Sequence, residues 1–188
     1  MYKYIFKGFI SFISALVLLI IFIIPFMIVA ILIKLDSKGS VLYRQTRIGR
    51  KGNSFEIFKL RTMVSNADQT GVFSTAQNDS RITKVGAFLR KTSLDELPQI
   101  LNILLGDMSL IGPRPDVPAQ EVNYTKDEFI KRHQVLPGIT GLAQSRNRHN
   151  LSNSARKRYD IFYNNNIGFI LDIRIIFYTL KALKKGSY

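Results

Sequence analysis

Two adjacent carboxylates with cations on either side are the residues whose types and spacing suggest chemistry. The pair is Asp95 and Glu96. Arg90 and Lys91 come shortly before it, and Arg114 follows between two prolines, whose backbone is restricted. A carboxylate that cations keep ionised can act as a nucleophile towards phosphorus, and the same cations can bind phosphate oxygens. The second carboxylate could hold Mg²⁺, which binds through one or two carboxylates together with substrate phosphates.

The same pair also fits ordinary helix capping. Apolar residues recur at helical spacing over residues 94–105, which predicts a helix there. Ser93 and Glu96 fit a capping box at its start. A slightly later start would make Asp95 the cap and would suit Pro98 better. Backbone N–H groups and the helix dipole favour acidic residues at a helix start, so capping and chemistry both stay open on this fragment.

Three longer motifs around these residues resemble the bacterial sugar transferases, the monotopic phosphoglycosyl transferases that start lipid-linked glycan assembly. The motifs are Ser-Leu-Asp-Glu-Leu-Pro-Gln (93–99), Gly-Asp-Met-Ser-Leu-Ile-Gly-Pro-Arg-Pro (106–115) and Pro-Gly-Ile-Thr-Gly-Leu-Ala-Gln (137–144). They occur in the order and at the relative spacing of that family. The resemblance covers nearly the whole chain and fits the minimal form of the family, without extra domains.

This resemblance implies transfer of a sugar-1-phosphate from a UDP-sugar to undecaprenyl phosphate, with release of UMP. Asp95 would attack the β-phosphorus and carry the phosphosugar covalently, and Glu96 would hold Mg²⁺. It also implies membrane lipids and downstream glycosyltransferases as partners, and no nucleic acid. The side chains expected to bind phosphate are Lys59, Arg90, Arg114 and Arg148.

The composition is strongly basic and lacks cysteine. The 188 residues include 27 Lys and Arg against 13 Asp and Glu, a formal net charge of +14, which predicts anionic partners. Nucleic acid, phospholipid headgroups and nucleotide phosphates all satisfy this charge. The absence of cysteine excludes disulfides and thiolate metal sites.

The chain divides into a membrane anchor over residues 1–35 and a catalytic domain over residues 36–188. From Ile10 to Ile33 the sequence is apolar apart from two serines. As one helix this stretch would be about 36 Å long, enough to cross a hydrocarbon core of about 30 Å. Cations are more numerous after this segment than before it, which predicts that the catalytic domain lies in the cytoplasm.

Cations at both ends of the apolar segment are unfavourable for a helix that crosses the membrane and natural for one that dips in and returns on the same side. Pro25 removes a backbone hydrogen bond and predicts a kink. Prolines also occur in spanning helices, so the residues alone leave both topologies open. The family resemblance implies the re-entrant form, on the cytoplasmic face of the bacterial inner membrane.

The remaining pattern predicts an α/β domain that is mostly helical, with one small β-hairpin. Two strands are expected over residues 41–48 and 55–63, and residues 137–144 are expected to form a Gly-rich turn whose amides could approach a ligand. The polar residues 66–78 fit a lid over the nucleotide or a plain connector. Apart from the helix at 94–105, helices are expected over residues 79–91, 119–134, 152–165 and 167–185, the last amphipathic and lying in the membrane interface.

Two other functions fit parts of the sequence. One is a membrane transferase that uses direct displacement, with Asp95 as a base or metal ligand. The other is a non-catalytic basic protein that binds membrane surfaces or nucleic acid, because residues 152–165 interleave aromatic and cationic side chains. No recognisable nucleic-acid-binding motif accompanies that stretch.

Overall fold

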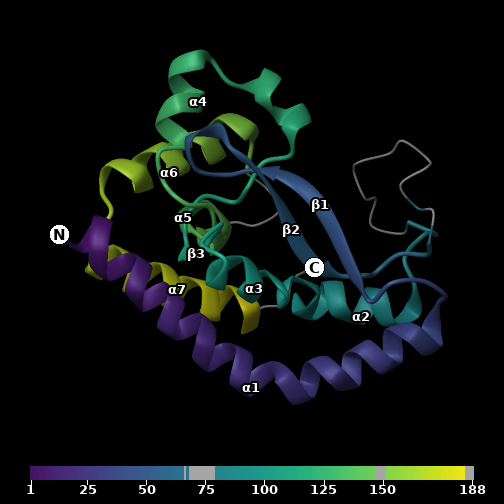
Figure 1. The fold of residues 1–188 in the computed structure, drawn as a ribbon. Helices are drawn as coiled ribbons and strands as arrows, with labels where there is room; N and C mark the ends of the chain where they lie inside the picture. Colours follow the sequence, from purple (N-terminus) through teal and green to yellow (C-terminus); the bar gives the residue numbers. More distant parts are fainter. Residues whose placement is uncertain (66, 68–78, 147–150, 185–188) are drawn as a thin grey trace.

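A layer of helices forms one side of the molecule, and the remaining elements form a body that stands on it (Figure 1). The computed structural model describes residues 1–65, 67, 79–146 and 151–184. Helix α1 (Lys7–Asp36) runs along the lower edge in this view, with α2 (Lys84–Thr92) and α7 (Phe169–Lys184) beside it. The β-hairpin and α4 (Lys126–Arg132) extend away from this layer. The chain is therefore mixed α/β and mostly helical, as predicted.

Helix α1 is long and apolar enough to cross a membrane, judged by length and composition. It extends beyond the predicted limits at both ends and bends partway along its length (Figure 1), and it contains Pro25. Four of its residues are buried, Lys7, Ser11, Ala15 and Ile33, whereas many of its large apolar side chains are exposed. A continuous apolar surface of this size suits contact with lipid rather than water.

Both ends of α1 are attached to the same body. Near its start, the Lys7 ammonium donates to Asp172 of α7 and to the Tyr163 hydroxyl, each at 2.7 Å. At its other end, the Arg61 guanidinium donates to the carbonyl oxygen of Ile33 at 3.3 Å and to that of Ser37 at 2.6 Å. These contacts join the apolar helix to that body at two well-separated points.

The predicted hairpin is present, formed by β1 (Leu42–Ile48) and β2 (Ser54–Leu60) in antiparallel pairing. The second strand ends earlier than predicted, because Met63 instead forms an isolated bridge with Ile82. Along β1 exposed and half-buried residues alternate, with Arg44 on the exposed face. The half-buried face turns towards α3 and the candidate site.

A second, smaller sheet was not predicted. Strand β3 (Ser109–Ile111) pairs in parallel with β4 (Gly138–Thr140), and α5 (Leu142–Arg146) follows. A Cβ atom on Gly138 would lie 2.0 Å from the backbone nitrogen of Gly112, so glycine is needed for this close approach. The predicted turn over residues 137–144 was therefore wrong, because a strand and a short helix form there and the glycines bring two protein backbones together.

Two helices are shorter than predicted because threonine caps interrupt the chain. The expected helix over 119–134 divides into a 3₁₀ segment (Pro118–Asn123) and α4, and Thr125 caps the second piece. The expected helix over 79–91 begins only at α2, where Thr83 accepts a hydrogen bond from a backbone N–H. In both places the cap residue is extended, which ends any continuous helix.

The last two helices match their predictions. Helix α6 (Asn153–Asn165) starts after its cap Ser152, and α7 follows with a mostly apolar outer face. The core between the hairpin and the helical layer is formed by the buried residues Ala15, Ile57, Ile100, Ile103 and Met108. This core joins β2 and α3 (Gln99–Leu104) to α1 and fixes the hairpin over the helical layer.

Candidate active site

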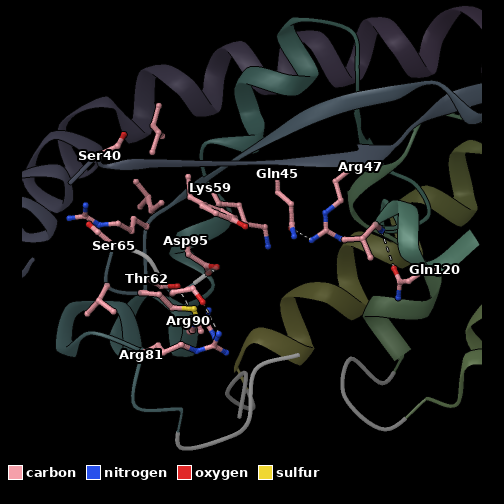
Figure 2. A pocket seen from close by; sticks show the side chains of 18 residues that line it. Ser40, Gln45, Arg47, Lys59, Thr62, Ser65, Arg81, Arg90, Asp95 and Gln120 are labelled. Atoms are coloured by element: carbon pink, nitrogen blue, oxygen red, sulfur yellow. Dashed lines mark hydrogen bonds between the residues drawn. The ribbon is translucent and has the colours of Figure 1, made fainter. Parts of the chain in front are cut away.

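A pocket of about 470 Å³ lies beside the hairpin, and Asp95 opens onto it (Figure 2). This volume is in the range of small-molecule binding sites. Among the described residues that line it, Asp95 is the one carboxylate. The cations that line it are Arg47, Lys59, Arg61, Arg81 and Arg90. Within this described lining, a single acidic group therefore faces a pocket whose other charges are positive.

Asp95 lies in a 3₁₀ turn (Leu94–Glu96) between α2 and α3 rather than at the start of a continuous helix. The predicted capping box is wrong, because Ser93 has left-handed backbone geometry and makes no side-chain cap hydrogen bond to this turn. Pro98, which has no N–H, precedes the first residue of α3. The carboxylate of Glu96 points towards two cations instead of back towards the turn, and this tertiary contact decides the local geometry.

Those two cations are Lys59 and Arg114, which the sequence had predicted as phosphate ligands. Glu96 is buried, and its Oε1 accepts from the Lys59 ammonium at 3.1 Å and from Arg114 Nη2 at 2.6 Å. Its Oε2 accepts from Arg114 Nη1 at 3.3 Å, which completes a bidentate pair. The negative charge of Glu96 raises the pKa of Arg114. Glu96 thus holds both cations beside Asp95.

The environment of Asp95 raises the pKa of its carboxyl group. Burial is the main cause and the adjacent Glu96 charge the second, while Lys59 and Arg90 act in the opposite direction. A carboxylate with a raised pKa is more basic in its ionised form, and a more basic oxygen is a better nucleophile towards phosphorus. Its side chain is half-buried and faces the pocket (Figure 2).

The remaining predicted residues divide into three cases. Arg90 lines the pocket, where its Nε donates to Thr62 Oγ1 at 2.8 Å. Arg148 lies outside the described residues. Pro25 belongs to α1 and takes no part in the pocket. The structure therefore brings Lys59, Arg90 and Arg114 into electrostatic reach of Asp95.

Arg47 and Gln45 also line the pocket, and the sequence interpretation missed both. Arg47 had been counted among the cations that follow the apolar segment. Its guanidinium donates to the carbonyl oxygen of Pro115 at 3.1 Å and to the side chain of Gln45. Alternation along β1 was the available signal, because it places these two residues on the same face as Tyr43, the cross-strand partner of Lys59.

A buried ionic network supports the backbone of Arg114 from behind. Arg132 pairs with both Asp116 and Asp160, and its Nη2 donates to the carbonyl oxygen of Arg114 at 2.8 Å. Asp116 also accepts from the Tyr124 hydroxyl at 2.8 Å. These residues are far apart in the chain, and no local pattern predicts their association.

The two carboxylates are not equally available to a magnesium ion. No group of three or more His, Cys, Asp or Glu side chains in the described ranges could hold a metal by itself. Asp95 and Glu96 are adjacent, and Mg²⁺ often binds one or two carboxylates and completes its shell with substrate phosphates and water. Both oxygens of Glu96 already accept from Lys59 or Arg114, whereas Asp95 lines the pocket. Asp95 is therefore the carboxylate that an ion bound with a phosphate substrate could contact directly.

A carboxylate that faces a cation-lined pocket, on a body attached to a long apolar helix, is the arrangement expected of a membrane-associated enzyme for anionic substrates. The model of the family described as bacterial sugar transferase matches residues 2–186. The chain therefore belongs to the bacterial sugar transferase family and is a transferase, which confirms the resemblance that its motifs indicated.

Three similar proteins place the chain within this family. An exopolysaccharide production protein PSS of Rhizobium leguminosarum bv. phaseoli is 42% identical, over 87% of this chain and 88% of that protein. A UDP-glucose:undecaprenyl-phosphate glucose-1-phosphate transferase of Klebsiella pneumoniae is 38% identical, over 94% of this chain and 40% of that protein.

The third is a UDP-N-acetylgalactosamine-undecaprenyl-phosphate N-acetylgalactosaminephosphotransferase of Aeromonas hydrophila. It is 38% identical, over 84% of this chain and 38% of that protein. This chain thus spans well under half of the two relatives whose names state a reaction, and most of the Rhizobium protein.

Proposed function

We propose that this enzyme transfers a sugar-1-phosphate from a UDP-sugar to undecaprenyl phosphate and releases UMP, the first membrane step in the synthesis of a glycan. The names of the Klebsiella and Aeromonas relatives both state an undecaprenyl-phosphate acceptor and a sugar phosphate transferred to it, with different sugars. The observation that carries the proposal is the position of Asp95. It is the carboxylate in the described lining of a cationic pocket, and the domain that holds this pocket is attached to a long apolar helix.

The reaction proceeds in two displacements. The carboxylate of Asp95 attacks the β-phosphorus of the donor, and a new oxygen–phosphorus bond forms while the bond to the α-phosphate oxygen breaks. UMP leaves with that electron pair, and the phosphosugar remains on Asp95. An oxygen of undecaprenyl phosphate then attacks the same phosphorus, which releases the Asp95 carboxylate and leaves a diphosphate-linked sugar on the lipid.

The cations around Asp95 offset the negative charge of the phosphates in both steps. Lys59 and Arg114 are already held beside it by Glu96, and Arg90 lines the same pocket. Pre-positioned charges of this kind stabilise a transition state without reorganisation at the moment of reaction. We extend the same role to Arg148 from its place in the family pattern. We keep Glu96 as the proposed Mg²⁺ ligand, a role that would require Lys59 or Arg114 to release one of its oxygens; the bound ion would supply further charge neutralisation.

The proposed topology is a re-entrant α1 on the cytoplasmic face of the inner membrane. Its support is the attachment of both helix ends to one body, through Lys7 at the start and Arg61 at the end. A helix that crossed the bilayer would place one end about 30 Å away on the opposite side, where it could not reach that body. Pro25 and the bend of α1 agree with a helix that turns back (Figure 1).

Helix α7 would lie in the headgroup region beside α1. Its start is joined to α1 by the Lys7–Asp172 ion pair, and its outer face is apolar. The exposed large apolar side chains of α7 are Phe169, Ile170, Ile173, Phe177 and Leu180. An amphipathic helix in that position would hold the pocket at the boundary where a lipid acceptor and a soluble donor can meet.

The direct test is a screen of UDP-sugars for UMP release by the purified chain in the presence of undecaprenyl phosphate. We expect UMP release with at least one donor. Without the donor no UMP should be released, and without undecaprenyl phosphate the release should stop after a single turnover. Incubation with the donor alone should leave one phosphosugar on the protein, detectable by intact mass. An active preparation that never carries this adduct would favour direct displacement.

Activity should depend on the ionisation of Asp95, and Glu96→Gln should move that dependence. The pKa of Asp95 lies above its ordinary value, so the rate falls as pH decreases through this raised value. Glu96→Gln removes a neighbouring negative charge and releases Lys59 and Arg114 from it, and both effects lower the pKa of Asp95. The acid limb of kcat/KM against pH should therefore move to lower pH, while the maximal rate falls.

The matched control is Glu56→Gln, because Glu56 lies on the exposed face of β2 in a solvent-exposed pair with Arg44. Its pH profile should match that of the wild type. If the acid limb of Glu96→Gln stays in place, a group other than Asp95 sets the pH dependence.

A further inference from the structure

We propose that Arg47, supported by Gln45, forms a second phosphate subsite that binds the α-phosphate of the nucleotide donor. This inference rests on the proposed function, because it concerns the donor of that reaction. The leaving nucleotide would then occupy the end of the pocket that is formed by the last residues of β1. Figure 2 shows this end, with Gln45, Arg47 and Gln120 on one side of Asp95 and Lys59.

Arg47 is a half-buried cation without a carboxylate in ion-pair contact among the described residues. Its hydrogen bonds go to the carbonyl oxygen of Pro115 and to the side chain of Gln45, both neutral groups. Its Nε is buried and has no hydrogen-bond partner. A buried donor left without a partner is costly, and an anion that binds beside Arg47 would accept from this donor and offset the charge of the guanidinium.

Arg47 is also placed among other cations, which strengthens the preference for an anionic ligand. Burial, and then the Arg114 guanidinium, lowers its pKa to about 10, so it keeps its charge at neutral pH. Lys59 likewise has Arg47 and Arg114 within electrostatic reach. Glu96 forms ion pairs with Lys59 and Arg114, whereas Asp116 and Glu96 act on Arg47 only through the longer-range electrostatic field. The guanidinium of Arg47 therefore remains available for direct contact with an anionic ligand.

The position along the strand assigns this charge to the nucleotide. Tyr43 is the cross-strand partner of Lys59, and Arg47 lies four residues further along β1, roughly 13 Å for an extended strand. The start of β1 packs against Ile33 of α1, whereas the hairpin end contacts α4 on the side away from α1. Arg47 is therefore at the end of the pocket that is remote from the apolar helix, where a soluble ligand can enter.

The reaction geometry agrees with this assignment. The β-phosphorus must lie at Asp95 to be attacked, so the α-phosphate occupies an adjacent position in the pocket. Among the described cations that line the pocket, Arg47 is the one that lies beyond Lys59 towards Gln45 and Gln120 (Figure 2). After the first step, the phosphate of UMP would stay bound at this subsite until UMP dissociates.

The test compares the binding of UMP and of uridine by the full-length chain in detergent micelles. The ratio of the two dissociation constants isolates the contribution of the phosphate, since a purely structural defect weakens both ligands alike. We expect the wild type to prefer UMP over uridine by about tenfold or more, the effect of hydrogen bonds to a charged group. Arg47→Gln should lose most of this preference, whereas Arg47→Lys, which keeps the charge, should retain a substantial part of it.

Arg44→Gln is the matched control, because Arg44 is on the exposed face of the same strand. Its preference for UMP should stay within about twofold of the wild type. An unchanged preference in Arg47→Gln, or a wild type without any preference, would overturn the subsite. A loss confined to the KM for undecaprenyl phosphate would also overturn it, since the cation would then serve the lipid. Absence of UMP release by a wild type that does prefer UMP would instead count against the proposed function.

Discussion

Asp95→Asn should abolish sugar-phosphate transfer while the protein remains folded and membrane-bound. We expect UMP release to fall by about 10³-fold or more, the scale on which loss of a covalent nucleophile acts. A neutral amide cannot take the place of the carboxylate that attacks phosphorus, and Lys59, Arg90 and Arg114 still surround the position in the variant. The loss should therefore appear in kcat, with donor binding largely retained.

The stability of this variant separates a chemical role from a structural one. Because the pKa of Asp95 is raised in the folded protein, its ionised form is less favourable there than in the unfolded chain. This penalty is absent at pH below the unfolded pKa and is fully present above the raised folded pKa. Asparagine removes it, so at neutral pH the variant should melt at the same temperature as the wild type or higher.

Intact mass after incubation with the UDP-sugar gives the second measurement. The wild type should gain one phosphosugar and Asp95→Asn none. Asp127→Asn, at an exposed position of α4, should behave as the wild type in both assays. A variant at position 95 that still transfers the sugar phosphate at a comparable rate would exclude this residue as the nucleophile.

The sequence predicted the elements that have a regular period or a marked composition. The apolar run of α1, the alternation of β1 and the amphipathic pattern of α7 each have such a signal, and each element is present. The likeness of three motifs to a family predicted which charged residues would gather around Asp95. Lys59 and Arg114 are far apart in the chain, yet both contact Glu96.

The predictions failed where tertiary contacts override local preference. Ser93 and Glu96 have the spacing of a capping box, but Glu96 gains more from two half-buried cations than from a backbone N–H, and the box does not form. The β3–β4 pair escaped prediction because each strand is only three residues long, and the approach of Gly112 to Gly138 has no periodic signature. Such features depend on partners that only the folded chain brings together.

The network behind Arg114 should be the most sensitive part of the fold. The side chains of Arg132 and Asp116 are each 1% exposed, and that of Asp160 is 2% exposed. Arg132→Met leaves both carboxylates buried without their common partner, which typically costs about 3–5 kcal/mol. For a chain of this length the melting temperature should fall by about 6–20 °C. Arg158→Met, at an exposed position on α6, should change the stability by less than about 0.5 kcal/mol.

The pH dependence of Arg132→Met identifies the cause of its instability. Burial already raises the pKa of Asp160 in the wild type, and Arg132 opposes that shift, so the variant should raise the pKa further. A group with a raised folded pKa destabilises the fold as pH increases through that value, and the penalty is relieved as pH decreases. The deficit of Arg132→Met should therefore narrow at acid pH, and Asp160→Asn in the same chain should recover part of it at neutral pH. A loss of stability that is independent of pH would indicate lost packing around a long side chain rather than unpaired charge. The position of the Arg114 backbone would then depend on the surrounding prolines and not on this ionic network.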